Sequence, residues 1–157
     1  MRSALMEALN EEVQAGNIKL NFFVLNRLFL AVAPGTPAPQ NFQIPNNLDY
    51  LLCYINGAVF QPAGTIIPAP DIDINLTDNS TGWLFSDQVV NWVQIVGTAQ
   101  EPFILPEPKL IPSNTSININ LTNNTAAVTF ARVNLAFVGL QVYYLRNFSR
   151  EDLPYWG

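Results

Sequence analysis

The chain of 157 residues has no histidine, a single cysteine and few charged residues, which make up 12% of the sequence. Without histidine it cannot form Ser-His-Asp or Cys-His catalytic groups or a histidine-ligated zinc site. Cys53 cannot form an intrachain disulfide, and its apolar neighbours indicate a buried thiol. We therefore predict a protein that is not an enzyme and has no cofactor or metal site.

Positive charge is also scarce and is not clustered. The seven Lys and Arg residues are spread along the chain, and the net charge is −5. Binding to a nucleic-acid backbone needs a basic patch, so nucleic acid is not an expected partner. A weakly charged surface gives little repulsion between neighbouring molecules, which favours a protein that works inside an assembly.

What the sequence does contain is alternation of apolar and polar residues. It is unbroken from Ser116 to Leu121, which predicts a strand with one buried and one exposed face. Residues 122–126 are rich in Asn and Thr and predict a turn, so we expect a hairpin whose second strand covers residues 131–137. Val128 and Phe130 lie in the opposite phase, which predicts a phase slip near Ala131, most simply a bulge.

A similar pattern occurs twice. Residues 72–80 and 117–125 match at six of nine positions, at an offset of 45 residues. Either a hairpin is repeated, or two Asn-rich hairpins have converged on one pattern; both interpretations require antiparallel strands. Two copies are too few for a solenoid, but they suit the two Greek keys of a β-sandwich or jelly roll.

The N-terminal third divides into a helix, an apolar stretch and a linker. Ser3 as a cap, apolar residues at spacing four and Gly16 as a stop predict a helix over residues 1–16, which lacks the apolar core of a secretory signal. Residues 18–32 are apolar but interrupted by polar residues, and they are too short for a membrane helix. The prolines of residues 34–39 predict an extended linker.

These features predict four segments: a helix and apolar arm over residues 1–33, a linker over 34–39, a sandwich domain over 40–145, and a tail over 146–157. The arm and the tail either belong to the core or bury their apolar residues on another subunit. The residues predicted for such an interface are Phe22, Phe23, Leu25, Leu28, Phe29, Tyr155 and Trp156.

Several local signals have two interpretations. Asn56-Gly57 is a strong hairpin signal. Asp71 and Asp73, with Asp78 nearby, are either calcium ligands or a solvated face, and no complete calcium-loop pattern is present. Trp83 and Trp92 are either core residues or a platform for stacking sugars.

The prolines flanking Phe103 to Leu105 predict an edge strand or an irregular loop. From Phe103 to Tyr144, this proline-flanked entry, the strand Ile117 to Leu121, the Asn turn and the long apolar return resemble the C-terminal half of small jelly-roll head proteins of tailed bacteriophages. These include cement or decoration proteins of the outer capsid. The resemblance implies a non-enzymatic virion protein, assembled in the host cytoplasm, that binds a major capsid protein or other virion subunits as a homotrimer.

We therefore expect an all-β sandwich or jelly roll with an N-terminal helix and apolar arm, acting as a capsid decoration protein. A carbohydrate-binding sandwich of a phage fibre or tail, and a head-tail or ring component, are the alternatives.

Overall fold

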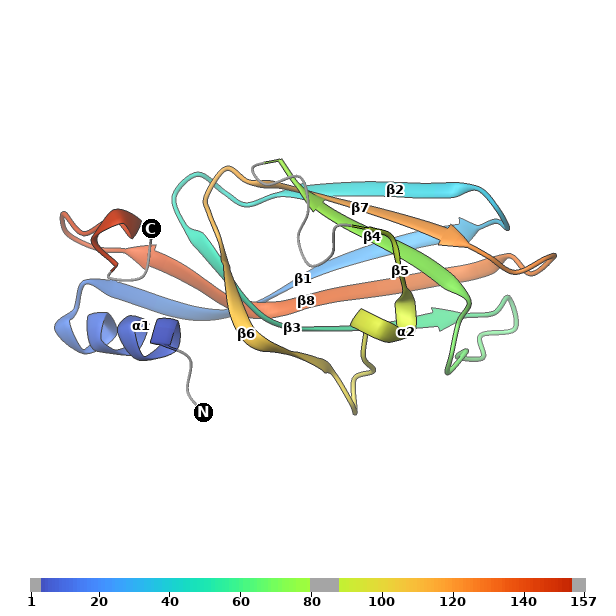
Figure 1. The fold of residues 1–157 in the computed structure, drawn as a ribbon, viewed down its shortest axis with the longest axis horizontal. Helices are drawn as coiled ribbons and strands as arrows, with labels where there is room; N and C mark the ends of the chain where they lie inside the picture. The colour runs from blue at the N-terminus through green and yellow to red at the C-terminus, as the bar shows by residue number, and fades with distance from the viewer. Residues whose placement is uncertain (1–3, 80–87, 154–157) are drawn as a thin grey trace.

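The chain forms two four-stranded antiparallel sheets that pack face to face in the computed structural model, which describes residues 4–79 and 88–153 (Figure 1). Sheet A has the strand order β1-β8-β3-β6, and sheet B has the order β2-β7-β4-β5. The strands are β1 (Ile18–Val32), β2 (Pro37–Gln43), β3 (Asp49–Phe60), β4 (Ile72–Asp78), β5 (Val90–Asn91), β6 (Phe103–Ile111), β7 (Ser116–Asn123) and β8 (Phe130–Tyr144). The predicted all-β sandwich is confirmed.

Three short helical elements accompany the sheets: α1 (Ala4–Ala15), α2 (Trp92–Ile95) and the 3-10 turn η1 (Arg150–Asp152). The predicted N-terminal helix is confirmed over Ala4–Ala15, and its predicted cap, Ser3, lies outside the described residues. The helix ends at Ala15. Gly16 follows with a φ of 75°, in the left-handed region, and the Asn17 N–H donates to the Glu12 carbonyl at 2.9 Å. α1 and the C-terminal segment lie at the same end of the sandwich (Figure 1).

The described residues form two apolar cores. The larger fills the space between the sheets, where apolar residues of β4, β7 and β8 alternate inward. The smaller lies on the outer face of sheet A, which α1 and the C-terminal segment cover at one end. Its buried members are Leu9, Ile18, Leu51, Leu110, Val142 and Leu153. The rest of this outer face has no such cover among the described residues.

The predicted hairpin at residues 116–137 is wrong, because its two strands belong to different sheets. β7 lies in sheet B and β8 in sheet A, so the Asn-rich turn carries the chain across the sandwich. The two similar segments, β4 and β7, instead pair with each other: Asn75 lies opposite Asn120, and Leu76 opposite Ile119. Each buries its apolar side in the same core and exposes its amides outward.

Residues 18–32 are not a separate arm. β1 pairs with β8 from Ile18 to Val32, so it is one strand of sheet A. The predicted linker is also largely structured, since Pro37 and Pro39 belong to β2, which pairs with β7. The sandwich therefore begins at Ile18 rather than at residue 40. Deleting residues 1–32 would remove a strand that contributes Phe29 and Val32 to the main core.

The phase slip near Ala131 is present but is not a bulge. Phe130 and Val133 both enter the main core, as do Phe29 and Val32 on β1, while the β1/β8 register stays constant. Both strands change face at the same place, where Ala31 has a φ of 52°. The bulge lies elsewhere, at Cys53, where the pairing of β3 shifts between Leu52 and Tyr54.

Candidate interaction surface

The two sheets have four edge strands, and only β1 is both long and free of proline. β2 contains Pro37 and Pro39, β6 contains Pro106 and Pro108, and β5 has only two residues. A proline nitrogen cannot donate a ladder hydrogen bond, and short or proline-bearing edges resist the addition of another strand. The prediction that residues 103–105 form an edge strand or a loop is confirmed by β6. Among the residues that the structure describes, the 15-residue β1 is therefore the edge most open to a partner.

Side chains of the protein itself close the second half of that edge. Arg27 Nη1 donates to the Asn26 carbonyl at 2.7 Å, and Gln40 Nε2 donates to the Leu28 carbonyl. These bonds occupy carbonyl groups that an added strand would need. Arg27 is also held over the Phe42 ring, with 4.8 Å between its guanidinium carbon and the ring centroid. Strand addition is thus restricted to the first half of β1.

Large apolar side chains are exposed along β1. Phe22 is 68% exposed and Leu30 67%, and Leu28 and Phe23 are also exposed. Isolated exposed apolar residues are ordinary, but Phe22, Leu28 and Leu30 point to the same face of β1 and form a patch of the kind that marks interaction sites, whereas Phe23 points to the opposite face. Burying each would stabilise a complex by about 1.5–3 kcal/mol before the costs of association.

The residues predicted for an interface differ in how exposed they are. Phe22, Phe23 and Leu28 are on the surface, whereas Leu25 is half-buried against the main core. Phe29 is 3% exposed and lies inside that core, so it is not available to a partner. The remaining two, Tyr155 and Trp156, lie outside the described residues. Leu30 was missed, because a strand pattern alone does not show that the edge beside it is unpaired.

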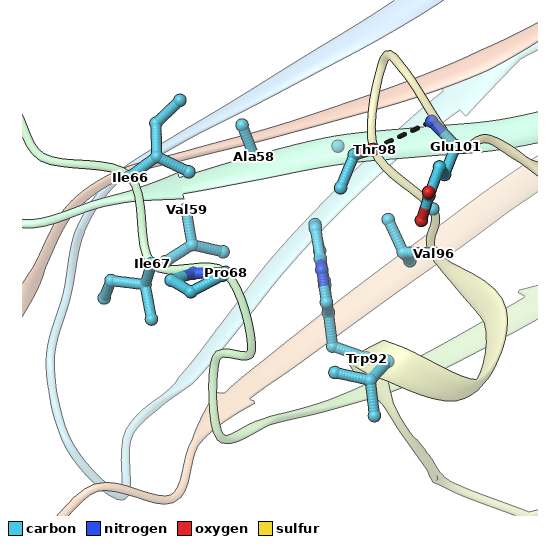
Figure 2. Close-up of a pocket in the computed structure, with 12 residues that line it drawn as sticks. Ala58, Val59, Ile66, Ile67, Pro68, Trp92, Val96, Thr98 and Glu101 are labelled. Atoms are coloured by element: carbon cyan, nitrogen blue, oxygen red, sulfur yellow. Dashed lines mark hydrogen bonds between the residues drawn. The ribbon is translucent and has the colours of Figure 1, made fainter.

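A pocket opens at the other side of the sandwich, beside α2 (Figure 2). It has a volume of about 260 Å³, and Val59, Ile67 and Trp92 supply apolar walls. Glu101 lies at its rim, where its backbone N–H donates to Thr98 Oγ1 at 3.0 Å. The lining of the pocket is about as polar as it is apolar, and it includes one carboxylate, that of Glu101.

Trp92 is part of the wall and not an exposed platform, since it is only 4% exposed. Its ring packs on Gly57, where an added Cβ would lie 2.6 Å from Trp92 Cζ2 and 2.6 Å from the Asn134 carbonyl. The Asn56-Gly57 hairpin signal was therefore wrong: both residues lie within β3, and the glycine makes room for the indole. Trp83, the other half of the predicted sugar platform, lies outside the described residues.

Asp49 is a buried carboxylate with several partners, and it is 1% exposed at the start of β3. Its carboxylate accepts hydrogen bonds from the Ser113 N–H at 2.6 Å and from Tyr144 Oη, and it pairs with Arg150 Nη1 at 3.1 Å. Burial, together with the bond to Asp49 and its charge, raises the pKa of Tyr144 above its ordinary range. The cluster holds η1 against the sandwich. The partners of the Asp49 carboxylate in this cluster are therefore all residues of the protein itself.

The other acidic residues do not converge. Asp78 is buried on the inner face of β4, whereas Asp73 is half-buried on the opposite face and Asp71 is exposed. No group of three or more His, Cys, Asp or Glu residues suited to a metal ion occurs within residues 4–79 and 88–153. None of the helices described there is long and apolar enough to cross a membrane.

Comparison with known proteins adds no assignment. No protein-family model matches the chain, and no curated protein matches its sequence.

Proposed function

We propose that this protein is a structural virion component, a jelly-roll decoration protein that stabilises a phage head by bridging capsid subunits. The observation that carries the proposal is the β1 edge: a long strand without proline, whose first half no described residue pairs with on its outer side, and whose outer face exposes Phe22, Leu28 and Leu30. A monomeric protein normally protects such an edge, so its retention points to a partner that covers it.

The strand order supports the jelly-roll part of the proposal. The chain passes between the sheets at nearly every connection, and only β4 and β5 are consecutive strands of one sheet. Eight strands in two four-stranded sheets, with β1 beside the last strand β8 and β2 beside β7, support the proposal of two interlocked Greek keys. Such a unit is a rigid block with its edges on the outside.

The surface composition supports an assembly role as well. The outward residues of β4 and β7 are mostly amides and hydroxyls, including Asn75, Asn118 and Asn120. Amide-rich, weakly charged faces tolerate close neighbours without strong repulsion. The expected partners are a major capsid protein and further copies of this chain, as a trimer.

Co-sedimentation with viral particles tests the proposal. Viral particles whose genome encodes this chain should carry the wild-type protein through a density gradient. The double variant Phe22→Asp with Leu30→Asp should be absent from the particle fraction. Val128→Asp is the matched control, because Val128 is 43% exposed but lies outside β1. Circular dichroism must show that all three variants are folded. Particles that lack the wild-type protein would refute the virion role, and a folded double variant that still co-sediments would refute the β1 edge as the contact.

A ring component of the head-tail junction would use the same edge. Immunogold labelling of particles separates the two roles, because a decoration protein labels the whole head and a ring component labels one vertex.

A further inference from the structure

The two ends of sheet A carry opposite charge. β1 contains Lys19 and Arg27 and no acidic residue. At the other end, β6 and the segment before it contain Glu101 and Glu107, with Lys109 as the basic residue. Because the strand order is β1-β8-β3-β6, these two edges lie on opposite sides of the molecule. We name them the β1 edge and the β6 edge; the β6 edge includes α2 and residues 97–102.

Both edges also expose large apolar side chains. The β1 edge has Phe22 at 68% exposure, and the β6 edge has Ile104 at 69%. Val93 of α2 and Ile66 are exposed beside the pocket that Trp92 lines. One edge is apolar and basic, and the other is apolar and acidic, so each is complementary to the other and not to itself.

The pocket beside Trp92 offers a place for a side chain of another molecule. In Figure 2 it opens between Ile66 and Pro68 on one side and Val96 and Glu101 on the other, with the Trp92 ring between them. A cavity of about 150 Å³ is enough to bind benzene in another protein. The 260 Å³ here can therefore receive an aromatic side chain.

We infer that the β1 edge of one copy docks on the β6 edge of a second copy, with Phe22 filling the Trp92 pocket and the basic residues of the β1 edge lying on the side of the acidic residues Glu101 and Glu107. The contact joins two different surfaces of the same chain, so it repeats head to tail and closes into a ring, such as the trimer proposed above, when the rotation allows. Pairing of β1 with β1 of another copy would instead bring two basic edges together. The inference rests on the proposed function, and it names this chain as one of the partners.

Two variants test it, each of which blocks one edge. Phe22→Asp removes the aromatic side chain and puts a negative charge opposite the acidic edge. Val93→Asp puts a charge at the mouth of the pocket on the other edge. Loss of one buried aromatic contact should weaken each contact about 10- to 100-fold. In sedimentation equilibrium the wild type should form a closed oligomer, and each variant alone should approach the chain mass of 17.4 kDa.

Mixing the variants gives the decisive result. Phe22→Asp keeps a good β6 edge and Val93→Asp keeps a good β1 edge, so an equimolar mixture should form a one-to-one complex of two chains that cannot close. Leu145→Asp, at a residue 40% exposed outside both edges, should assemble as the wild type does. Raising the salt from about 0.05 M to 1 M should weaken the wild-type oligomer, since screening acts over about 3 Å at 1 M.

Three outcomes would overturn the head-to-tail contact. These are a wild type that stays monomeric at all concentrations, a Val93→Asp variant that assembles normally while Phe22→Asp does not, and folded variants that form no complex when mixed. Circular dichroism and a thermal melt of each variant show whether it is folded. A monomer that still co-sediments with particles would refute this contact and leave the virion role intact. A wild-type protein that oligomerises but is absent from particles would refute the virion role and leave this contact intact.

Discussion

Replacing Asp49 by Ala should destabilise the protein through three interactions at once. The change removes an acceptor for the Ser113 N–H and for Tyr144 Oη, and it removes the ion-pair partner of Arg150. Breaking a fully buried ion pair costs about 3–5 kcal/mol. Arg150 is 28% exposed and can be partly rehydrated, so we expect the free energy of unfolding to fall by about 2–4 kcal/mol.

The measurement is equilibrium urea denaturation followed by far-UV circular dichroism. Asp49→Asn is the matched variant, because an amide keeps the shape and can still accept a bond while losing the charge. It should cost less than Asp49→Ala. Arg150→Met removes the other partner, and the double variant with Asp49→Asn isolates the coupling between the two side chains. An Asp49→Ala variant within about 0.5 kcal/mol of the wild type would refute the idea that this cluster fastens the C-terminal segment.

Three further changes can be predicted from the packing. Gly57→Ala should lower the unfolding free energy by about 1–3 kcal/mol in urea melts, because the new methyl group would overlap the Trp92 ring and a backbone carbonyl; an unchanged midpoint would contradict this. Asn123→Ala should cost a similar amount or more, since its buried amide donates to two carbonyls and accepts from Thr125; a cost below about 0.5 kcal/mol would contradict the role of these bonds. Burial raises the pKa of Tyr50 and of Tyr144, so both hold their protons more tightly when folded, and stability present below about pH 10 should fall as the pH rises above it. Tyr144→Phe should flatten the decline in thermal melts between about pH 9 and 11, and an equally steep decline would rule out its contribution.

The alkaline prediction has one further contributor. Burial also raises the pKa of the Cys53 thiol, which lies near the Leu51 carbonyl, so the thiol too stays protonated in the folded protein beyond its usual range. Its ionisation on unfolding adds to the loss of stability above about pH 8.5. The Tyr144→Phe comparison should therefore be repeated with Cys53→Ala present in both proteins.

The alternation of apolar and polar residues over 72–78 and 116–121 determined that these segments are strands with one buried face. This pattern is local, because a strand's side chains point to opposite faces in turn. The helix over residues 4–15 was equally readable, since its spacing of apolar residues and its terminal glycine are both local signals. These local patterns were enough to predict the fold class without knowing which strands pair with each other.

What the sequence by itself did not determine is which strands pair. The Asn turn after β7 leads into the other sheet, and the similar strands β4 and β7 became neighbours instead. Residues 18–32 have the same apolar composition whether they form an arm or a strand, and only the pairing with β8 made them part of the sandwich. Gly57 looks like a turn residue until the Trp92 ring, 35 positions later, is seen against it.

The exposure of β1 was likewise decided by tertiary structure. Phe22 and Phe29 are the same residue type on the same strand, yet one is 68% exposed and the other 3%. The difference arises because the two side chains point to opposite faces of sheet A: Phe29 points into the core between the sheets, and Phe22 points to the outer face, which the described residues cover only at one end. Composition determined that apolar surface had to be buried somewhere; the order of the strands decided which of it stayed outside, because each sheet leaves two strands with only one neighbour.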